Sequence, residues 1–318
     1  MRPQSAGKEF NGMAGAFSAM FTPFTPNNTV NEEAIFHLIE YGIREGLKGF
    51  YLTGSTGEGL LLSLAERALV YRTAVQAARG RCKLIAQVGA VSTEDSVALA
   101  KAAADAGCDW ISSVAPVYFG QSFEAQVRHY KMISEATDLP FLVYCFNQVL
   151  VPERDVRLFD LKNVKGMKYT GSDYYGVQKM RRKIGKETIF FAGRDEQLLC
   201  ALSLGDVFAG GIGLNYNMIP RHFAMICEAA AKNDFRAAAK WQDEANRLVD
   251  LILEPGKWDN WSNFKILMRH VGIDCGFCRA PYAPLSPAQV RERLAAFARL
   301  GIVEKNRACA PTAKRTRA

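Results

Sequence analysis

The chain has 318 residues, of which 49% are hydrophobic and 23% charged, with a mean hydropathy of -0.07. This composition is typical of a soluble globular protein with a sizeable core, and it excludes disorder of the whole chain. The length allows one large α/β domain with an appendage, or two ordinary domains.

The positive charge is concentrated at the C-terminal end. The formal net charge is +8, and five of the forty lysines and arginines lie in the last fifteen residues. We interpret this end as a solvated, disordered basic tail. No basic face interleaved with aromatic residues accompanies it, as nucleic-acid binding would require, so nucleic acid is not an expected partner.

The eight cysteines favour a reducing compartment, because most of them fall among apolar or small neighbours. The single CxxC pair, Cys275 and Cys278, lacks the second pair of ligands that a metal site needs, so no metal is expected. The N-terminal residues contain no apolar signal-peptide core, and no run approaches about eighteen apolar residues. We therefore predict a cytoplasmic protein that does not span a membrane.

Strand-like and helix-like segments alternate along most of the chain. The predicted strands are short apolar runs, as in parallel sheets covered on both faces, and the predicted helices repeat apolar residues every three or four positions. Several helices begin with a capping residue and end with glycine. In chain order, strands at 15–21, 49–54, 83–90, 109–116, 140–146, 164–171, 188–193 and 207–213 precede helices at 31–46, 63–80, 93–107, 122–137, 152–161, 173–185, 194–205 and 217–233.

Eight such βα units predict an α/β fold of the (β/α)8 TIM-barrel class, because a doubly wound sheet has fewer strands and carries a nucleotide-binding fingerprint that is missing here. From Asp234 onward the pattern is purely helical. We therefore predict an N-terminal tail over 1–12, a barrel over 13–232, a C-terminal helical extension over 233–300 and the disordered basic tail over 301–318.

Reactive groups of such a barrel lie where its strands end. The sixth strand carries Lys168, which is either a solvated strand-end lysine or an amine buried in the barrel. A buried amine has a lowered pKa, is a nucleophile, and can form a Schiff base with a carbonyl group. Tyr144, one strand earlier, is either a core tyrosine or a proton shuttle.

Two loops offer further candidates, each with a structural alternative. "GSTGE", from residue 54, has backbone N–H groups and two hydroxyls that could hold a carboxylate, or it is a plain turn. "RDE", from residue 194, supplies two acids to a pocket, or it is an acidic helix start that complements the helix dipole.

Seven motifs occur in order along the chain and carry a family resemblance. They are "GSTGEG" at 54–59, "SLAER" at 63–67, "APVYF" at 115–119, "VYCFN" at 143–147, "GMKYTGSD" at 166–173, "AGRDEQLL" at 192–199 and "GGIGLNYN" at 210–217. With these motifs the sequence resembles the N-acetylneuraminate lyase and dihydrodipicolinate synthase family of class I aldolases, from about Met13 to about Arg299.

The resemblance implies a role for each matching position. Lys168 matches the Schiff-base lysine, Tyr144 the proton-shuttling tyrosine, and Ser55 with Thr56 the pair that holds the pyruvoyl carboxylate. Tyr118 matches an aromatic residue that family members contribute near the site of a neighbouring subunit. The pocket for the rest of the sugar is matched by Thr170, Gly193, Asp195 and Glu196. The resemblance also implies a homotetramer that takes a keto acid and a sugar and needs no cofactor or metal.

Three details favour the lyase branch. The carboxylate loop reads Ser55-Thr56 where the synthase branch has two threonines, no arginine follows Tyr144 closely, and adjacent acids suit a polyol chain. One detail departs from that branch: Leu214 and Asn215 stand where sialic acid lyases have Ser-Thr, so a pocket hydroxyl is lost.

We therefore predict a lyase that cleaves a 2-keto-3-deoxy sugar acid, N-acetylneuraminate before others, to pyruvate and N-acetylmannosamine. The alternatives are a dihydrodipicolinate synthase or another 2-keto-3-deoxy acid aldolase of the same scaffold. A protein of a different class, which binds a sugar acid without catalysis, is the third alternative.

Overall fold

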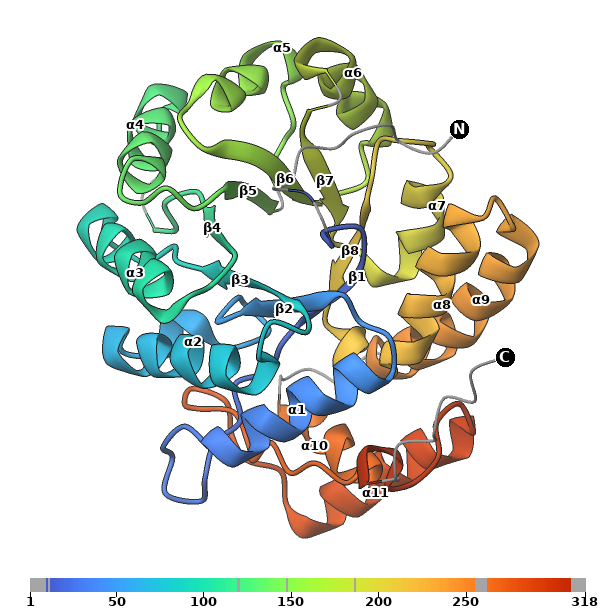
Figure 1. Ribbon diagram of the computed structural model, residues 1–318. Helices are drawn as coiled ribbons and strands as arrows, with labels where there is room; N and C mark the ends of the chain where they lie inside the picture. Colours follow the sequence, from blue (N-terminus) through green and yellow to red (C-terminus); the bar gives the residue numbers. More distant parts are fainter. Residues whose placement is uncertain are drawn as a thin grey trace.

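The computed structural model describes residues 10, 12–118, 121–146, 148–185, 187–254 and 262–309. Eight parallel strands pair in sequence order, and β8 closes the barrel against β1 (Figure 1). This confirms the predicted TIM-barrel fold. The strands are β1 (Gly15–Ala19), β2 (Gly49–Leu52), β3 (Lys83–Gln87), β4 (Trp110–Val114), β5 (Phe141–Phe146), β6 (Val164–Thr170), β7 (Ile189–Ala192) and β8 (Gly210–Gly213).

A helix follows each strand, and these helices surround the barrel in Figure 1. Local capping explains where several begin: Ser63 and Glu66 form a reciprocal capping box at the start of α2. The helices are α1 (Glu32–Arg44), α2 (Leu64–Ala78), α3 (Thr93–Ala106), α4 (Phe123–Ser134), α5 (Pro152–Asp155), α6 (Tyr174–Ile184), α7 (Leu198–Leu202) and α8 (Pro220–Ala231).

The predicted helices at 152–161 and 194–205 are shorter than their patterns indicate. α5 continues as the 3-10 turn η3 (Val156–Asp160), and α7 is preceded by the 3-10 turn η4 (Asp195–Gln197). In the second case the Asp195 side chain binds the loop after β8 instead of capping a helix. Further 3-10 turns are η2 (Gly59–Leu61), η5 (Asn215–Asn217) and η6 (Arg307–Cys309).

The core has two parts, because successive side chains of a strand point to opposite faces. One part lies between the strands and the helices and includes Met167 and Tyr169 of β6. The other fills the barrel interior. Its buried members are Met13, Phe17, Ala19, Tyr51, Ile85, Trp110, Leu142, Tyr144, Ile189, Phe191 and Ile212.

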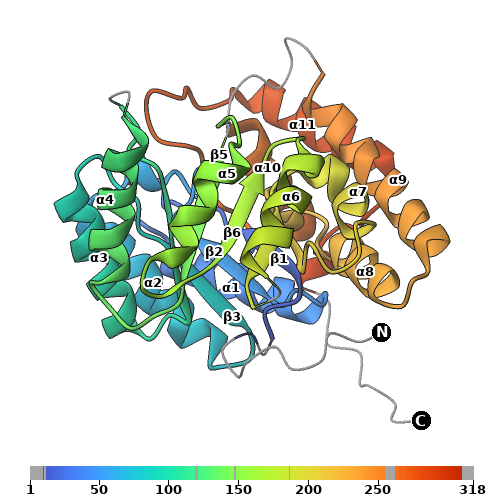
Figure 2. The ribbon, with the colours of Figure 1, turned by 90° about the horizontal axis from the view of Figure 1, so that it is seen from above.

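The C-terminal part of the chain is helical, as expected, with α9 (Phe235–Ile252), α10 (Ser262–Val271) and α11 (Pro287–Leu300). α9 and α11 pack together on one flank of the barrel (Figures 1 and 2). Residues 301–309, in the predicted basic tail, lie against α1, since Arg307 pairs with Glu45 at 2.9 Å. The exact domain boundaries stay predictions, and residues 1–9, 11 and 310–318 of the two tails lie outside the described residues.

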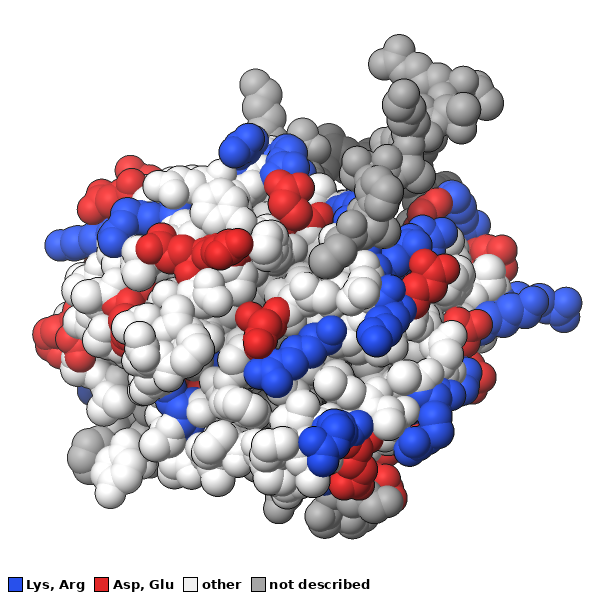
Figure 3. Space-filling model, turned by 90° about the horizontal axis from the view of Figure 1, so that it is seen from below, with Lys and Arg blue, Asp and Glu red and all other residues white. Residues whose placement is uncertain are grey.

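The surface carries charges of both signs. Figure 3 shows lysine and arginine side chains interspersed with aspartate and glutamate on the face that it draws, which is the pattern of an ordinary solvated surface. Within the described ranges, no helix is both long and apolar enough to cross a membrane.

Candidate active site

Lys168 is a buried amine and not a solvated strand-end lysine. It lies on β6 with 5% of its surface exposed. Its Nζ atom is 4.1 Å from the centre of the Tyr144 ring and 4.5 Å from that of Tyr51. Burial lowers the pKa of Lys168 to about 7, although the nearby carboxylate of Asp195 acts in the opposite direction. A large fraction of this amine is therefore neutral and nucleophilic at neutral pH.

Tyr144 faces Lys168 because the two residues are register partners on β5 and β6. Thr170 Oγ1 donates a hydrogen bond to the Tyr144 hydroxyl at 3.3 Å. Burial raises the pKa of Tyr144 to about 12, so the phenol is protonated at neutral pH. The hydroxyl can donate a proton, and it is held where a group bound to Lys168 would lie.

Tyr51 is a neighbour of Lys168 that the sequence motifs did not reveal. Its hydroxyl donates to Ser112 Oγ at 3.0 Å, and Ser112 Oγ donates in turn to the Leu142 carbonyl at 2.6 Å. The chain of hydrogen bonds fixes the ring beside the amine. The only signal in the sequence was a tyrosine in the apolar run "GFYL". This run predicts a strand, but it does not predict that Tyr51 lies beside Lys168.

The loop with Ser55 and Thr56 is a tight turn at the end of β2. The N–H of Glu58 donates to the Ser55 carbonyl at 3.0 Å, and the N–H of Gly59 donates to the Gly54 carbonyl at 3.0 Å. A Cβ atom on Gly59 would lie 1.9 Å from a backbone oxygen, so only glycine fits there. Ser55 is exposed and Thr56 is buried, which places two hydroxyls on a rigid backbone.

Asp195 lies buried between the ends of β7 and β8. Its Oδ2 atom accepts hydrogen bonds from the backbone N–H of Asn215 at 2.7 Å and from the Asn215 Nδ2 atom at 2.9 Å. Burial raises the pKa of Asp195 to about 7, while these hydrogen bonds oppose the shift. The other side-chain atom of this asparagine, Oδ1, is buried with no partner among the described residues. Asn215 therefore positions Asp195.

Glycines make room for these side chains. A Cβ atom on Gly193 would lie 1.9 Å from Thr170 Oγ1, and one on Gly213 would lie 1.8 Å from Asp195 Oδ1. Neither position tolerates a side chain without moving its neighbour. Gly193 thus contributes space, so that Thr170 can reach Tyr144.

Three other predicted positions lie farther out. Glu196 is partly exposed and pairs with Arg194 at 3.3 Å. Leu214 is partly buried and packs against the core between barrel and helices. Tyr118 is 80% exposed, so it is not part of the buried cluster of Lys168, Tyr144, Thr170 and Asp195.

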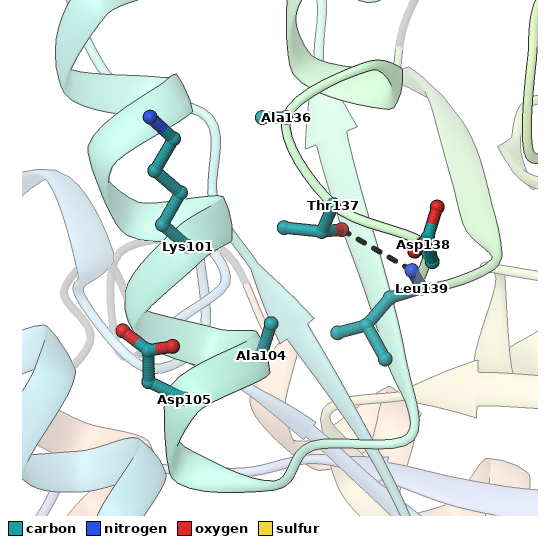
Figure 4. A pocket seen from close by; sticks show the side chains of 7 residues that line it. All are labelled: Lys101, Ala104, Asp105, Ala136, Thr137, Asp138 and Leu139. Atoms are coloured by element: carbon teal, nitrogen blue, oxygen red, sulfur yellow. Dashed lines mark hydrogen bonds between the residues drawn. The ribbon is translucent and has the colours of Figure 1, made fainter.

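A surface hollow of about 390 Å³ lies elsewhere on the barrel (Figure 4). α3 contributes Lys101 and Asp105, and residues 136–139, which precede β5, form the other wall. This hollow is at the end of the barrel where strands begin, whereas Lys168 is near the end where they finish. It is therefore separate from the buried cluster around Lys168.

The sequence matches a known protein family over most of its length. The sequence pattern described as the dihydrodipicolinate synthetase family matches residues 12–299. The chain belongs to this family. In this family member, the described residues contain no group of three or more His, Cys, Asp or Glu side chains that could hold a metal ion.

Relatives in the dihydrodipicolinate synthetase family include several named lyases. The chain is 33% identical over 274 residues to an N-acetylneuraminate lyase of Clostridium perfringens strain SM101, which covers 85% of this chain and 93% of the relative. It matches the crystal structure of N-acetylneuraminate lyase from Mycoplasma synoviae with a TM-score of 0.82 and 30% identity, over 90% and 97% of the two chains.

A third relative was crystallised with a small molecule. It is the N-acetylneuraminate lyase from Fusobacterium nucleatum complexed with pyruvate, which the chain matches with a TM-score of 0.82 and 29% identity, over 91% of this chain and 97% of that one. The similarity thus extends over nearly the full length of each relative.

Proposed function

We propose that this protein is a Schiff-base-forming class I lyase. It reversibly cleaves a 2-keto-3-deoxy sugar acid to pyruvate and an aldose. Our first candidate for the substrate is N-acetylneuraminate, which gives N-acetylmannosamine as the aldose. The observation that carries the proposal is the buried Lys168 amine, with its lowered pKa, against the ring of Tyr144. An iminium group is itself the electron sink for breaking a C–C bond, so the proposed reaction uses neither a metal nor an organic cofactor.

The first stage forms the iminium. The neutral Nζ of Lys168 adds to the C2 ketone, and a proton moves from nitrogen to the former carbonyl oxygen, giving a carbinolamine. Tyr144 donates its proton to the departing hydroxyl, which leaves as water. The products are a protonated imine on Lys168 and a phenolate on Tyr144. These opposite charges stabilise each other, because Nζ lies 4.1 Å from the ring centre.

The second stage breaks the bond between C3 and C4. The Tyr144 phenolate takes the proton of the C4 hydroxyl, C4 becomes the aldehyde of the sugar, and the bonding electrons move to the iminium nitrogen as an enamine. Tyr144 then returns the proton to C3. Water hydrolyses the resulting iminium, and the proton released in this step returns to the Tyr144 phenolate. Pyruvate leaves, and the Lys168 amine is regenerated.

The choice of substrate rests on the walls of the site. We assign Ser55 and Thr56 to the substrate carboxylate, and Thr170, Gly193, Asp195, Glu196 and Leu214 to the sugar chain. Carboxylate side chains accept hydrogen bonds from hydroxyls, which suits a polyol. The similarity to N-acetylneuraminate lyases favours N-acetylneuraminate as the substrate, and the complex of one such lyase with pyruvate favours a pyruvate-forming reaction.

The deciding experiment is reductive trapping. Pyruvate with borohydride is expected to add one covalent adduct to Lys168, seen in the intact mass and located by peptide mapping; an unchanged mass would refute the mechanism. Pyruvate release from N-acetylneuraminate and 2-keto-3-deoxygluconate then identifies the substrate. Faster condensation of pyruvate with aspartate semialdehyde would identify a synthase, and binding without turnover would identify a non-catalytic protein.

We also propose that the protein works as a homo-oligomer, a tetramer by family resemblance, in the cytoplasm. Exposed apolar side chains gather on the segments that follow the neighbouring strands β2, β3 and β4, which suits contact with a second copy. They are Leu60, Leu61, Leu64, Val91, Val117 and Tyr118. Among the residues whose side chains the structure describes, seven cysteines are free thiols, which favours a reducing compartment. Sedimentation equilibrium measures the assembly.

A further inference from the structure

We propose that Lys265, on α10 in the C-terminal extension, is a positioning residue for the substrate carboxylate. It acts through Glu58, whose backbone closes the turn that carries Ser55 and Thr56. The inference rests on the proposed function, because it assumes that this turn receives a carboxylate. It assigns to the helical extension a part in the active site of the barrel.

The ion pair between Lys265 and Glu58 is buried. Lys265 Nζ lies 2.8 Å from Glu58 Oε1, and the exposed fractions of the two side chains are 0% and 2%. The ammonium also donates to the Thr22 carbonyl at 2.7 Å and lies 4.1 Å from the centre of the Phe24 ring. A buried charge with this many partners has one defined position, and so does the carboxylate that it binds.

The second oxygen of Glu58 is held by the same part of the chain. Glu58 Oε2 accepts a hydrogen bond from the backbone N–H of Arg279 at 2.9 Å. The Arg279 side chain in turn pairs with Glu66 in the capping box of α2. Residues 265 and 279 therefore bind both oxygens of one carboxylate, which lies 207 positions before Lys265 in the chain.

The Glu58 backbone connects this clamp to the two hydroxyls. Glu58 has a φ of 55°, in the left-handed region that a residue with a side chain rarely adopts, so tertiary contacts must stabilise the turn. Its N–H donates to the Ser55 carbonyl at 3.0 Å. Releasing the Glu58 side chain would relax the turn and move Ser55 and Thr56, because these residues lie inside it.

The Lys168 amine does not depend on this clamp. Tyr144 is on β5 and Lys168 is on β6, and their positions come from strand register. Loss of Lys265 is therefore expected to weaken the capture of a ketone that carries a carboxylate, and to spare a ketone that lacks one. A general loss of structure would affect both ketones equally.

The test compares trapping by borohydride with pyruvate and with hydroxyacetone, which has a hydroxymethyl group in place of the carboxylate. For Lys265→Met we expect the half-saturating pyruvate concentration to rise about tenfold, with hydroxyacetone trapping unchanged. Lys265→Arg keeps a cation and should recover part of the pyruvate affinity. Lys83→Met is a control for the loss of a lysine ion pair, because it removes a partly exposed pair with Asp109 at the other end of the barrel.

A folded protein is needed for this comparison, and Lys265→Met alone leaves the Glu58 charge buried. The double variant Glu58→Gln with Lys265→Met removes both charges and should show the same selective loss. Equal loss with both ketones, or unchanged pyruvate affinity in the double variant, would overturn the proposal. Failure of the unmodified protein to trap pyruvate would instead refute the proposed function.

Discussion

The Nζ atom of Lys168 lies 4.1 Å from the centre of the Tyr144 ring, and the two residues are register partners on β5 and β6. Adjacent parallel strands hold this pair together, so its geometry is as rigid as the barrel itself. In the proposed reaction this fixes the nucleophile and the proton donor on one side of the site. The loop after β2 and the loops after β7 and β8 are left to set which substrate reaches them.

The reactivity of Lys168 should depend on pH near neutrality. A pKa lowered to about 7 means that the amine loses its proton as pH rises through that value, so Schiff-base formation should increase from acid to neutral pH and then level off. The rate of trapping by pyruvate and borohydride, measured across this range, gives the midpoint. A midpoint typical of an exposed lysine, above about 10, would contradict the burial argument.

Asp195→Asn should move this midpoint to lower pH. The Asp195 carboxylate stabilises the ammonium form of Lys168, and its removal leaves burial unopposed. The same trapping assay measures the shift. Glu124→Gln serves as a control, because this glutamate pairs with Arg157 on the surface and should leave the midpoint unchanged. A shift to higher pH in Asp195→Asn would show that another group controls the amine.

Tyr144→Phe should slow both stages of the proposed reaction, because Tyr144 gives a proton in Schiff-base formation and takes one in cleavage. We expect pyruvate to be trapped on Lys168 more slowly, and kcat for sugar-acid cleavage to fall by about a hundredfold or more, the range lost with a general acid–base group. Tyr51→Phe is the matched control, since it removes a hydroxyl bound to Ser112 from the other ring beside Nζ. Equal losses in the two variants would assign no special role to Tyr144.

Gly193→Ala should destabilise the protein by about 1–3 kcal/mol, because the added Cβ would meet Thr170 Oγ1 at 1.9 Å. Chemical denaturation measures the free energy of unfolding. Adding Thr170→Ala removes that oxygen and should restore part of the loss. Additive destabilisation in the double variant would mean that the two residues do not collide.

Leu214→Ser should change the preference among sugar acids and leave pyruvate trapping as it is. The substitution introduces a hydroxyl at the position where the family resemblance implies one, and a hydroxyl that pairs with one substrate discriminates against another that lacks the partner. Pyruvate release from N-acetylneuraminate and from 2-keto-3-deoxygluconate provides the comparison. An unchanged ratio of kcat/KM values would remove Leu214 from the determinants of specificity.

The amino-acid sequence alone determined the barrel and the order of its parts. Short apolar runs alternate with helical periodicity eight times, and both patterns are local, so they can be counted without knowing which strands meet. The family motifs are local patterns too, and they marked Lys168, Tyr144 and Asp195. Local patterns were less reliable at 194–205, where an acidic start favoured a longer helix than α7 (Leu198–Leu202).

The surroundings of the reactive groups were decided by the closure of the barrel. Whether Lys168 is buried depends on Tyr51 and Tyr144, which reach it from strands β2 and β5, and the sequence left that question open. The partner of Asp195 is 20 residues away, and that of Glu58 is 207 residues away. Such contacts form only when distant segments meet in the folded chain, and the pKa values and positions of the reactive groups follow from them.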